Sequence, residues 1–373
     1  MIQGKCLFIV NGLGLGNSTR CFAIIEHLYQ EGIEVHVLTS GNGAFFFSNK
    51  REVASVTETE ALHYGKSRDG KLSIWRTLIG VRSMHRAYKN KTRQLNDLLD
   101  CIGPEVVVAD SDYFIFPVNK RKIPLVGINN SDVVVSEYFA RRGKPASIRS
   151  QFWCIEFMDY CFHKTFYDHV LSPAPWPIPL RNPKFQRIGV IVRNKLVKAA
   201  EQRRMSARRK SNDEKLAVFM LSGSTFSAQI DFTKNTLPCR MEVVGRDGES
   251  TGNVRFLGKM NDNTAKLLEA DVLIVNAGFS AVSEAFILGK PTLVIPVPNH
   301  AEQYLNAQMV VDAGIGQVVN EQNVLEELGK VLEQDADLSQ RKLRPISSNG
   351  AWEAASAILK LMGRDVADHK LAA

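Results

Sequence analysis

Residues 272–284 carry the groups that a protein uses to bind a phosphate and a ribose. Val272 to Asn276 is an apolar run of strand length, and Ala277-Gly278-Phe279-Ser280 is a turn of mostly small residues before a predicted helix. Free backbone amides and the positive end of the helix dipole make such a helix N-terminus an anion site. Glu284, inside the first turns of that helix, is placed to accept hydrogen bonds from two ribose hydroxyls.

A second group of polar side chains follows the next apolar run along the chain. Residues 291–297 read as another buried strand, and His300, Glu302 and Gln303 come after it, at the start of a helix that also carries Asn306. The Glu302-Gln303 pair offers a carboxylate and an amide, which together can bind the hydroxyls of a sugar. The two segments together predict a pocket for a nucleotide sugar.

The segment 271–317 resembles the donor-binding region of GT-B glycosyltransferases, especially the lipid-linked N-acetylglucosaminyltransferase of peptidoglycan synthesis and the plant and antibiotic glucosyltransferases. The residues that this resemblance assigns to the donor are Gly278, Ser280 and Ala281 for the diphosphate, Glu284 for the ribose, and Glu302 and Gln303 for the transferred sugar. The chain departs from these families at Asn276, where they place a phosphate-binding His or Arg. The phosphate contact there would be weaker or come from elsewhere. The alternative is an ordinary strand-helix-strand unit in which Glu284 only caps its helix.

Two further segments complete the expected donor site. Gly223, Ser224 and Thr225 follow a predicted strand over 217–221, and in the related transferases this loop also contacts the donor phosphate. Main-chain groups around Leu257 occupy the position where the resemblance places the nucleobase. No Asp-x-Asp follows a strand near this site, so we expect neither a metal ion nor a cofactor. Fixed amides and dipoles would stabilise the leaving group instead.

The first predicted strand, residues 6–10, ends in a glycine-rich loop over residues 11–20. Its spacing is G-x-G-x-G, and no acid ends the second predicted strand, which argues against a dinucleotide site. The loop resembles the G-x-G-H-x-x-R loop of bacterial and archaeal GT-B enzymes, whose His lies beside the acceptor or acts as the base. Gly14, Gly16 and Arg20 match that loop, whereas Asn17 replaces the His. A loop kept glycine-rich only for close packing is the alternative.

Because Asn17 cannot take up a proton at neutral pH, another group must act as the catalytic base. Asp110 and Asp112 follow a predicted strand over 105–109, which places them at the carboxyl edge of the sheet, where ligands bind. A carboxylate that is desolvated in a closed sugar site can have a raised pKa and act as a base. Asp132, after the strand over 125–128, is a second candidate. Each of the three could instead be a turn or capping residue.

Predicted strands and helices alternate along the whole chain, which is typical of parallel sheets with crossover helices. We expect an α/β protein, and the resemblance implies the GT-B arrangement of two Rossmann-like domains facing each other across a cleft. The expected parts are an acceptor domain at 1–195, a basic linker or loop at 196–215, a donor domain at 216–350, and at 351–373 a C-terminal helix packing back on the first domain, followed by a tail. The first crossover helix would begin at Thr19 with Ser18 as its cap.

The positive charge is concentrated in the first half of the chain. Residues 1–190 hold 24 Lys and Arg against 17 Asp and Glu, whereas residues 216–373 hold 14 against 19. A predicted basic and aromatic helix over 75–99, with Arg141, Arg142, Lys144 and Arg149, would suit a lipid- or phosphate-bearing acceptor or a peripheral contact with an anionic membrane. An ordinary surface helix packed on the sheet is the alternative. No nucleic-acid-binding motif accompanies these charges, so we expect no nucleic-acid partner.

The six cysteines form no C-x-x-C pair, and no leader or membrane-spanning run is recognisable, which indicates a cytoplasmic protein. The expected activity is transfer of a hexose or N-acetylhexosamine from a nucleoside diphosphate, with UDP the expected carrier, to a hydroxyl acceptor. That acceptor could be a lipid-linked or cell-envelope glycan. Two alternatives remain: a nucleotide-sugar hydrolase of the same fold, and a non-catalytic subunit that only binds the donor. Asn17 speaks against the first and motivates the second.

Overall fold

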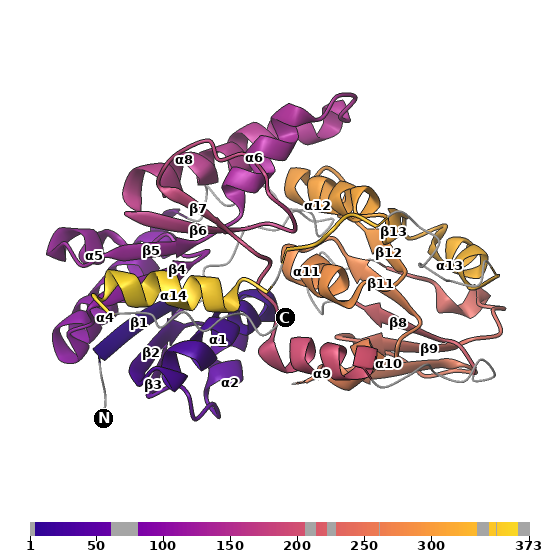
Figure 1. Cartoon of the computed structure of the whole chain (residues 1–373), viewed down its shortest axis with the longest axis horizontal. Coiled ribbons are helices and arrows are strands. Elements are labelled where there is room, and N and C mark those ends of the chain that lie inside the picture. The colour runs from indigo at the N-terminus through magenta and orange to yellow at the C-terminus, as the bar shows by residue number, and fades with distance from the viewer. Residues whose placement is uncertain are drawn as a thin grey trace. The chain divides into compact units, whose positions relative to one another are not determined.

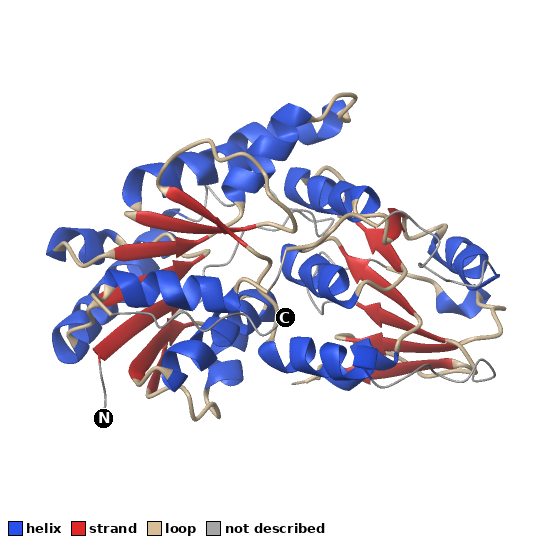
Figure 2. Cartoon of the chain, in the orientation of Figure 1, coloured by secondary structure: helices blue, strands red, loops and turns tan. Residues whose placement is uncertain are grey.

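The computed structural model describes residues 4–60, 81–205, 214–221, 229–260, 262–333, 343–347 and 349–364. Within them the chain forms two parallel sheets, each flanked by helices, as Figures 1 and 2 show. The chain folds into two compact units. The first unit comprises residues 1–136, 159–191 and 349–373, and the second comprises residues 137–158 and 192–348. The two sheets confirm the predicted α/β class with two Rossmann-like domains.

The sheet of the first unit has seven strands in the order β3-β2-β1-β4-β5-β6-β7, all paired in parallel. The strands are β1 (Gly4–Val10), β2 (Ile33–Thr39), β3 (Ser55–Glu58), β4 (Val106–Asp110), β5 (Leu125–Ile128), β6 (His169–Pro173) and β7 (Phe185–Ile188). The helices are α1 (Leu15–Gln30), α2 (Asn42–Phe47), α4 (Val81–Ile102), α5 (Phe116–Arg121), α6 (Ser131–Ala140), α8 (Phe157–Phe166) and α14 (Ala351–Leu361). α6 and α8 each continue across the boundary into the second unit.

The sheet of the second unit has six parallel strands in the order β10-β9-β8-β11-β12-β13. The strands are β8 (Leu216–Met220), β9 (Arg240–Val244), β10 (Val254–Gly258), β11 (Val272–Asn276), β12 (Thr292–Ile295) and β13 (Gly316–Val318). The α-helices are α7 (Arg149–Gln151), α9 (Asn194–Met205), α10 (Thr264–Glu269), α11 (Phe279–Leu288), α12 (Ala301–Asp312) and α13 (Val324–Glu333). Short helical turns are η1 (Ala146–Ile148), the π-helix η2 (Phe152–Glu156) and η3 (Phe232–Lys234).

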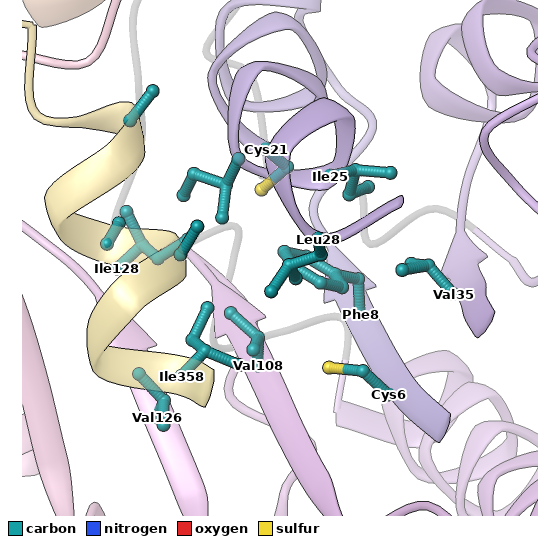
Figure 3. Packing of buried hydrophobic residues seen from close by; sticks show 14 of the residues in the cluster. Cys6, Phe8, Cys21, Ile25, Leu28, Val35, Val108, Val126, Ile128 and Ile358 are labelled. Carbon is teal, nitrogen blue, oxygen red and sulfur yellow. The ribbon is translucent and has the colours of Figure 1, made fainter. Parts of the chain in front are cut away.

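The core of the first unit lies between its sheet and the helices α1 and α14. Figure 3 shows Cys21, Ile25 and Leu28 of α1 close to Phe8 of β1, with Ile358 of α14 beside the middle strands. These side chains recur at three- and four-residue spacing on α1, which directs one face of the helix onto the sheet. The central strands β4 and β5 are buried at every residue, as expected for a parallel sheet covered by helices on both faces. The C-terminal helix is therefore part of the core that holds β1 and β4 in place.

The described chain differs from the sequence predictions at three places. α1 begins at Leu15, with Gly14 in an extended conformation as its N-cap, so that Ser18 is a buried residue inside the helix and not its cap. Part of the expected linker at 196–215 is the helix α9, in which Leu196 and Ala200, four residues apart, are buried. Residues 137–158, here named the arm, cluster with the second unit, although they were expected in the first domain. The predicted helix over 75–99 lies partly outside the described residues.

Candidate functional site

The turn between β11 and α11 is the center of the expected donor site. Gly278 is the N-cap of α11 in an extended conformation, and a Cβ at this position would meet nothing within 4 Å. The positive end of the helix dipole at this N-terminus favours an anion. Binding of the diphosphate by Gly278, Ser280 and Ala281 remains a prediction. Ser280, Ala281 and Asn276 are partly exposed, so all three are accessible at the end of β11.

Two side chains of α12 fix the loops beside this turn. The Asn306 side chain is buried and donates to the carbonyl of Ala277 at 3.0 Å, which ties α12 to the β11–α11 turn. Gln303 accepts a hydrogen bond from the amide of Val297 at 2.9 Å, in the segment after β12. The Gln303 carbonyl is thus occupied by the main chain, and its amide group remains the part of the side chain that can donate to a ligand.

Glu284 lies on α11 in an ion pair that the sequence did not predict. The Nε and Nη2 atoms of Arg193 each lie 2.8 Å from Oε1 of Glu284. The Glu284 side chain is 13% exposed; burial raises the pKa of its carboxyl group, and Arg193 opposes that rise. Arg193 directly follows the buried apolar residues 190–192, and a single arginine after such a run is the signal that could have identified it. The predicted ribose ligand is therefore a partly desolvated carboxylate with a cationic neighbour.

The expected nucleobase position coincides with an irregularity in β10. The register between β10 and β9 shifts between Phe256 and Gly258, so Leu257 has no ladder partner. Gly258 has φ +61°, a left-handed conformation that favours glycine, and a Cβ there would lie 2.7 Å from Asp247. A β-bulge changes the direction in which nearby main-chain groups point, here at the predicted nucleobase position. Gly223, Ser224 and Thr225 lie outside the described residues.

Glu302 belongs to a cluster at the start of α12. Its carboxylate, that of Glu156 and the imidazole of His300 have possible metal-ligand atoms that all lie within 4.8 Å of one another. Burial lowers the pKa of His300, against the raising effect of Glu302, and so favours a neutral imidazole. However, Oε1 of Glu156 accepts a hydrogen bond from Gln151 at 2.6 Å, and the positive end of the α12 dipole disfavours a cation. The expectation of a metal-free site remains a prediction.

In the first unit, the loop between β1 and α1 is closely packed. Gly12 packs against the loop after β2. A Cβ on Gly12 would lie 1.7 Å from the carbonyl oxygen of Ser40 in that loop. The Asn11 side chain donates to the carbonyl of Ser111 at 3.1 Å and accepts from the amide of Leu13 at 3.1 Å. The loop after β1 and the loop after β4 are thus fixed to each other at the carboxyl edge of the sheet. Close packing, the alternative explanation of the glycines, applies at Gly12; a Cβ at Gly14 would meet nothing within 4 Å.

Arg20 and Asp110 form a buried bidentate ion pair behind this loop. Nε of Arg20 lies 2.9 Å from Oδ2 of Asp110 and Nη2 lies 2.5 Å from Oδ1; the residues are 6% and 0% exposed. Nη2 also donates to the side-chain oxygen of Asn17 at 3.3 Å, and the Asn17 amide donates to the carbonyl of Asn11 at 3.4 Å. Asn17 therefore orients the loop through hydrogen bonds at both ends of its amide.

The other two candidate bases also have cationic partners. Asp112, 6% exposed, pairs with Lys91 and accepts from the amide of Phe114 at 3.0 Å. Asp132, fully buried, pairs with Arg187 at 2.6 Å. All three candidate bases are held in ion pairs with a cationic side chain. The structure thus gives all three a structural role, and the assignment of a base to Asp110 or Asp112 stays a prediction.

The chain matches the family described as "Glycosyl transferase family 1" over residues 4–334. This chain belongs to glycosyl transferase family 1. A glycosyltransferase of Methanosarcina acetivorans is 25% identical over 391 residues, covering 97% of this chain and 98% of the relative. The fold is similar to that of MurG from Acinetobacter baumannii (TM-score 0.58, 13% identity, 96% and 99% of the two chains). It is also similar to that of the UDP-GlcNAc 2-epimerase of Neisseria meningitidis bound to UDP-GlcNAc (TM-score 0.61, 13% identity, covering 95% of this chain and 100% of that chain).

These matches confirm the predicted GT-B glycosyltransferase. Within the second unit of this glycosyltransferase, the structure brings Gly278, Asn306 and the neighbouring turn together, and it adds Arg193 beside Glu284. Within the first unit it brings Asn17, Arg20 and Asp110 into one hydrogen-bonded group. Asp132 is not part of that group; it pairs with Arg187 of β7. In the part of the chain that the structure describes, no helix is both long and apolar enough to cross a membrane.

Proposed function

We propose that this glycosyltransferase moves a hexose or N-acetylhexosamine from a UDP-sugar, held by the second unit, to a hydroxyl acceptor. The observation that carries the proposal is the geometry of α11, whose N-terminus follows β11 at an open Gly278 and whose Glu284 is a partly desolvated carboxylate. A diphosphate at the amides would have its ribose further along the same helix. The epimerase with a similar fold binds UDP-GlcNAc, which supports a uridine carrier.

The proposal is tested by a screen of nucleotide sugars for thermal stabilisation, followed by mass analysis of products formed with cell-envelope extracts. We expect a UDP-sugar to raise the melting temperature, because a ligand that binds only the folded state stabilises it. Transfer should continue in the presence of EDTA, since amides and dipoles would stabilise the leaving group. Stabilisation by no nucleotide sugar would contradict the proposal, and loss of transfer in EDTA would contradict its metal-free mechanism.

For the acceptor, we propose a lipid-linked or phosphate-bearing glycan reached by peripheral contact with an anionic membrane from the cytoplasm. The arm supports this proposal, because Phe139, Trp153, Ile155 and Met158 are between 42% and 59% exposed. Ring contacts join Phe139 to Trp153, and Arg142 and Arg149 are exposed in the same segment. Aromatic and basic side chains together suit the surface of an anionic bilayer. Sedimentation with anionic and neutral vesicles tests it: equal recovery in both would contradict the membrane contact.

A second candidate is a protein that binds the donor without transferring it. The observation in its favour is that Asn17 replaces the expected His while Asp110, Asp112 and Asp132 all have cationic partners. A hydrolase of the same fold would need a group that activates water, which Asn17 cannot do. Formation of a glycosylated product distinguishes transfer from donor binding, and release of free sugar without an acceptor identifies hydrolysis.

A further inference from the structure

The arm, residues 137–158, contacts α12 near both ends of that helix. At the N-terminal end, Oε1 of Gln151 accepts a hydrogen bond from the amide of Ala301 at 2.8 Å. Ala301 is the first residue of α12, and the side chain of its N-cap residue, His300, makes no capping hydrogen bond. The arm thus supplies a cap to an amide that has no partner within its own helix.

The cap is itself held in place by a buried carboxylate. Nε2 of Gln151 donates to Oε1 of Glu156 at 2.6 Å, which fixes the orientation of the Gln151 amide and leaves its oxygen for Ala301. Glu156 is 7% exposed and ends the π-helix η2. Nδ1 of His300 lies 3.8 Å from the same oxygen of Glu156. Gln151 at the end of α7 and Glu156 at the end of η2 thus both lie at the start of α12.

At the C-terminal end of α12, the contact is an ion pair. Arg141 pairs with Asp312, the last residue of α12, and donates to Glu137 of the arm at 3.0 Å and 2.8 Å. Burial alone would lower the pKa of Arg141. Asp312 and Glu137 raise this pKa by more than burial lowers it, so the net shift of the pKa is upward. An acidic residue at a helix C-terminus is unfavourable to the helix dipole, and the charge of Arg141 offsets it.

The arm is packed firmly enough to act as a support. Phe152 is fully buried and stacks on Tyr138, with ring centroids 3.4 Å apart and an interplanar angle of 4°. Nζ of Lys144 lies over the other ring of that stack, 4.8 Å from the centroid of Tyr138. Phe152 directly follows Gln151 in the chain, and Tyr138 lies three residues before Arg141, so the stack joins the two parts of the arm that contact α12.

We propose that the arm holds α12 in the position at which Glu302 and Gln303 contact the transferred sugar, with Gln151 and Arg141 as positioning residues. The inference rests on the proposed function, since the sugar contact belongs to it. Ala301, the capped residue, directly precedes Glu302 and Gln303 in the chain. A shift of the first turn of α12 therefore moves both side chains relative to the β11–α11 turn. The nucleotide, held by α11 and β10, would be affected less.

The first test measures binding of UDP and of UDP-GlcNAc by calorimetry. In Gln151→Ala we expect affinity for the UDP-sugar to fall about fivefold, the size of a lost helix cap, while affinity for UDP stays unchanged. Arg141→Ala should show the same split, and Arg141→Lys, which keeps the charge, should recover part of it. Ser150→Ala and Ser147→Ala, at exposed positions of the arm, are the matched controls. Equal losses for both ligands, or no loss, would overturn the proposal.

A second measurement tests whether the arm holds α12 independently of whether the protein binds a UDP-sugar. Hydrogen exchange at the amides of residues 301–304 in the ligand-free protein reports on the cap whether or not a UDP-sugar binds. We expect faster exchange there in Gln151→Ala than in Ser150→Ala, with exchange in β11 unchanged. Unchanged exchange at these amides would show that the arm does not hold α12. Faster exchange in Gln151→Ala, together with no binding of a UDP-sugar by the parent protein, would contradict the proposed function but would still show that the arm holds α12.

Discussion

The residues of the candidate site act in pairs that the sequence does not display. Glu284 shares its carboxylate with Arg193, and Arg20 shares its guanidinium between Asp110 and Asn17. Arg193 lies 91 residues from Glu284 and Arg20 lies 90 residues from Asp110, so residue type and spacing identify one partner and not the other; only Asn17 and Arg20 belong to one motif. The cationic partner determines what each carboxylate can do, because a carboxylate in an ion pair fixes the positions of the groups around it.

The binding of UDP should depend on pH through Glu284. An ionised carboxylate accepts hydrogen bonds from both ribose hydroxyls, and protonation converts one of its oxygens into a donor. Burial raises the pKa of Glu284, against Arg193, so affinity should be full above that pKa and fall as the pH decreases through it. The fall would begin at a higher pH than an exposed glutamate gives. Calorimetry at a series of pH values measures it, and Glu284→Gln should bind weakly with a flatter profile. Parallel profiles for the two proteins would contradict this role.

Asp110→Asn should destabilise the first unit. The substitution leaves the guanidinium of Arg20 buried without its counter-charge, which typically costs about 3–5 kcal/mol. Denaturant unfolding measures the change, with Asn17→Ala as the comparison, because Asn17 provides a single longer hydrogen bond to Arg20. Asn17→Ala should raise the Michaelis constant for the acceptor. An Asp110→Asn protein of unchanged stability but about 10²–10⁴-fold lower activity would instead support the predicted base.

At the scale of elements, the strands that the chain forms are largely those that its apolar runs predict. Residues 6–10, 125–128 and 272–276 are short apolar runs, and each lies in a buried parallel strand because helices cover both sheet faces. The start of α1 was predicted at the wrong residue, because a serine followed by a helical pattern resembles a cap even when the helix begins earlier.

Other features of the elements had no local signal. The bulge at Leu257 depends on the register with β9, and the cap of α12 depends on Gln151, 150 residues away. Neither can be inferred from the sequence near the site, because each is a pairing between separate segments. The resemblance predicts the donor residues, and the structure shows which backbone groups and partner side chains hold them.

Gln303→Ala should separate sugar recognition from nucleotide recognition. Its side chain accepts from the amide of Val297, which leaves its own amide to donate to a sugar hydroxyl. Loss of one such hydrogen bond typically costs about 1–1.5 kcal/mol, so affinity for the UDP-sugar should fall about tenfold while UDP binds as before. Gln308→Ala, on the same helix, is the matched control. Equal losses for UDP and UDP-sugar would place Gln303 on the nucleotide instead.

At the scale of the whole molecule, each compact unit is assembled from separate stretches of the chain. The last helix, α14, belongs to the first unit, and the arm belongs to the second although the chain on both sides of it belongs to the first. A sequence divided at one boundary near residue 195 cannot show this, because unit membership depends on contacts between distant segments. The apolar face of α14 lies against α1 and the sheet of the first unit.

Ile358→Ala should therefore destabilise the first unit without changing the affinity of the donor site for UDP. Ile358 is fully buried in the core shown in Figure 3, and truncation of a buried isoleucine to alanine typically costs about 2–5 kcal/mol. We expect a lower unfolding midpoint in denaturant with unchanged affinity for UDP under conditions where the protein is folded. An unchanged midpoint would show that α14 contributes little to the core.

The central claim is that the second unit holds a nucleoside diphosphate through α11 and Glu284. Its most direct test is the affinity of Glu284→Ala for UDP, measured by calorimetry beside the parent and beside Glu326→Ala, an exposed glutamate of α13. Removal of a carboxylate that accepts from ribose hydroxyls leaves polar groups unpaired and costs about 1–3 kcal/mol. We predict affinity about tenfold weaker or more in Glu284→Ala, and parent affinity in Glu326→Ala. Unchanged UDP affinity in a folded Glu284→Ala protein would contradict the account.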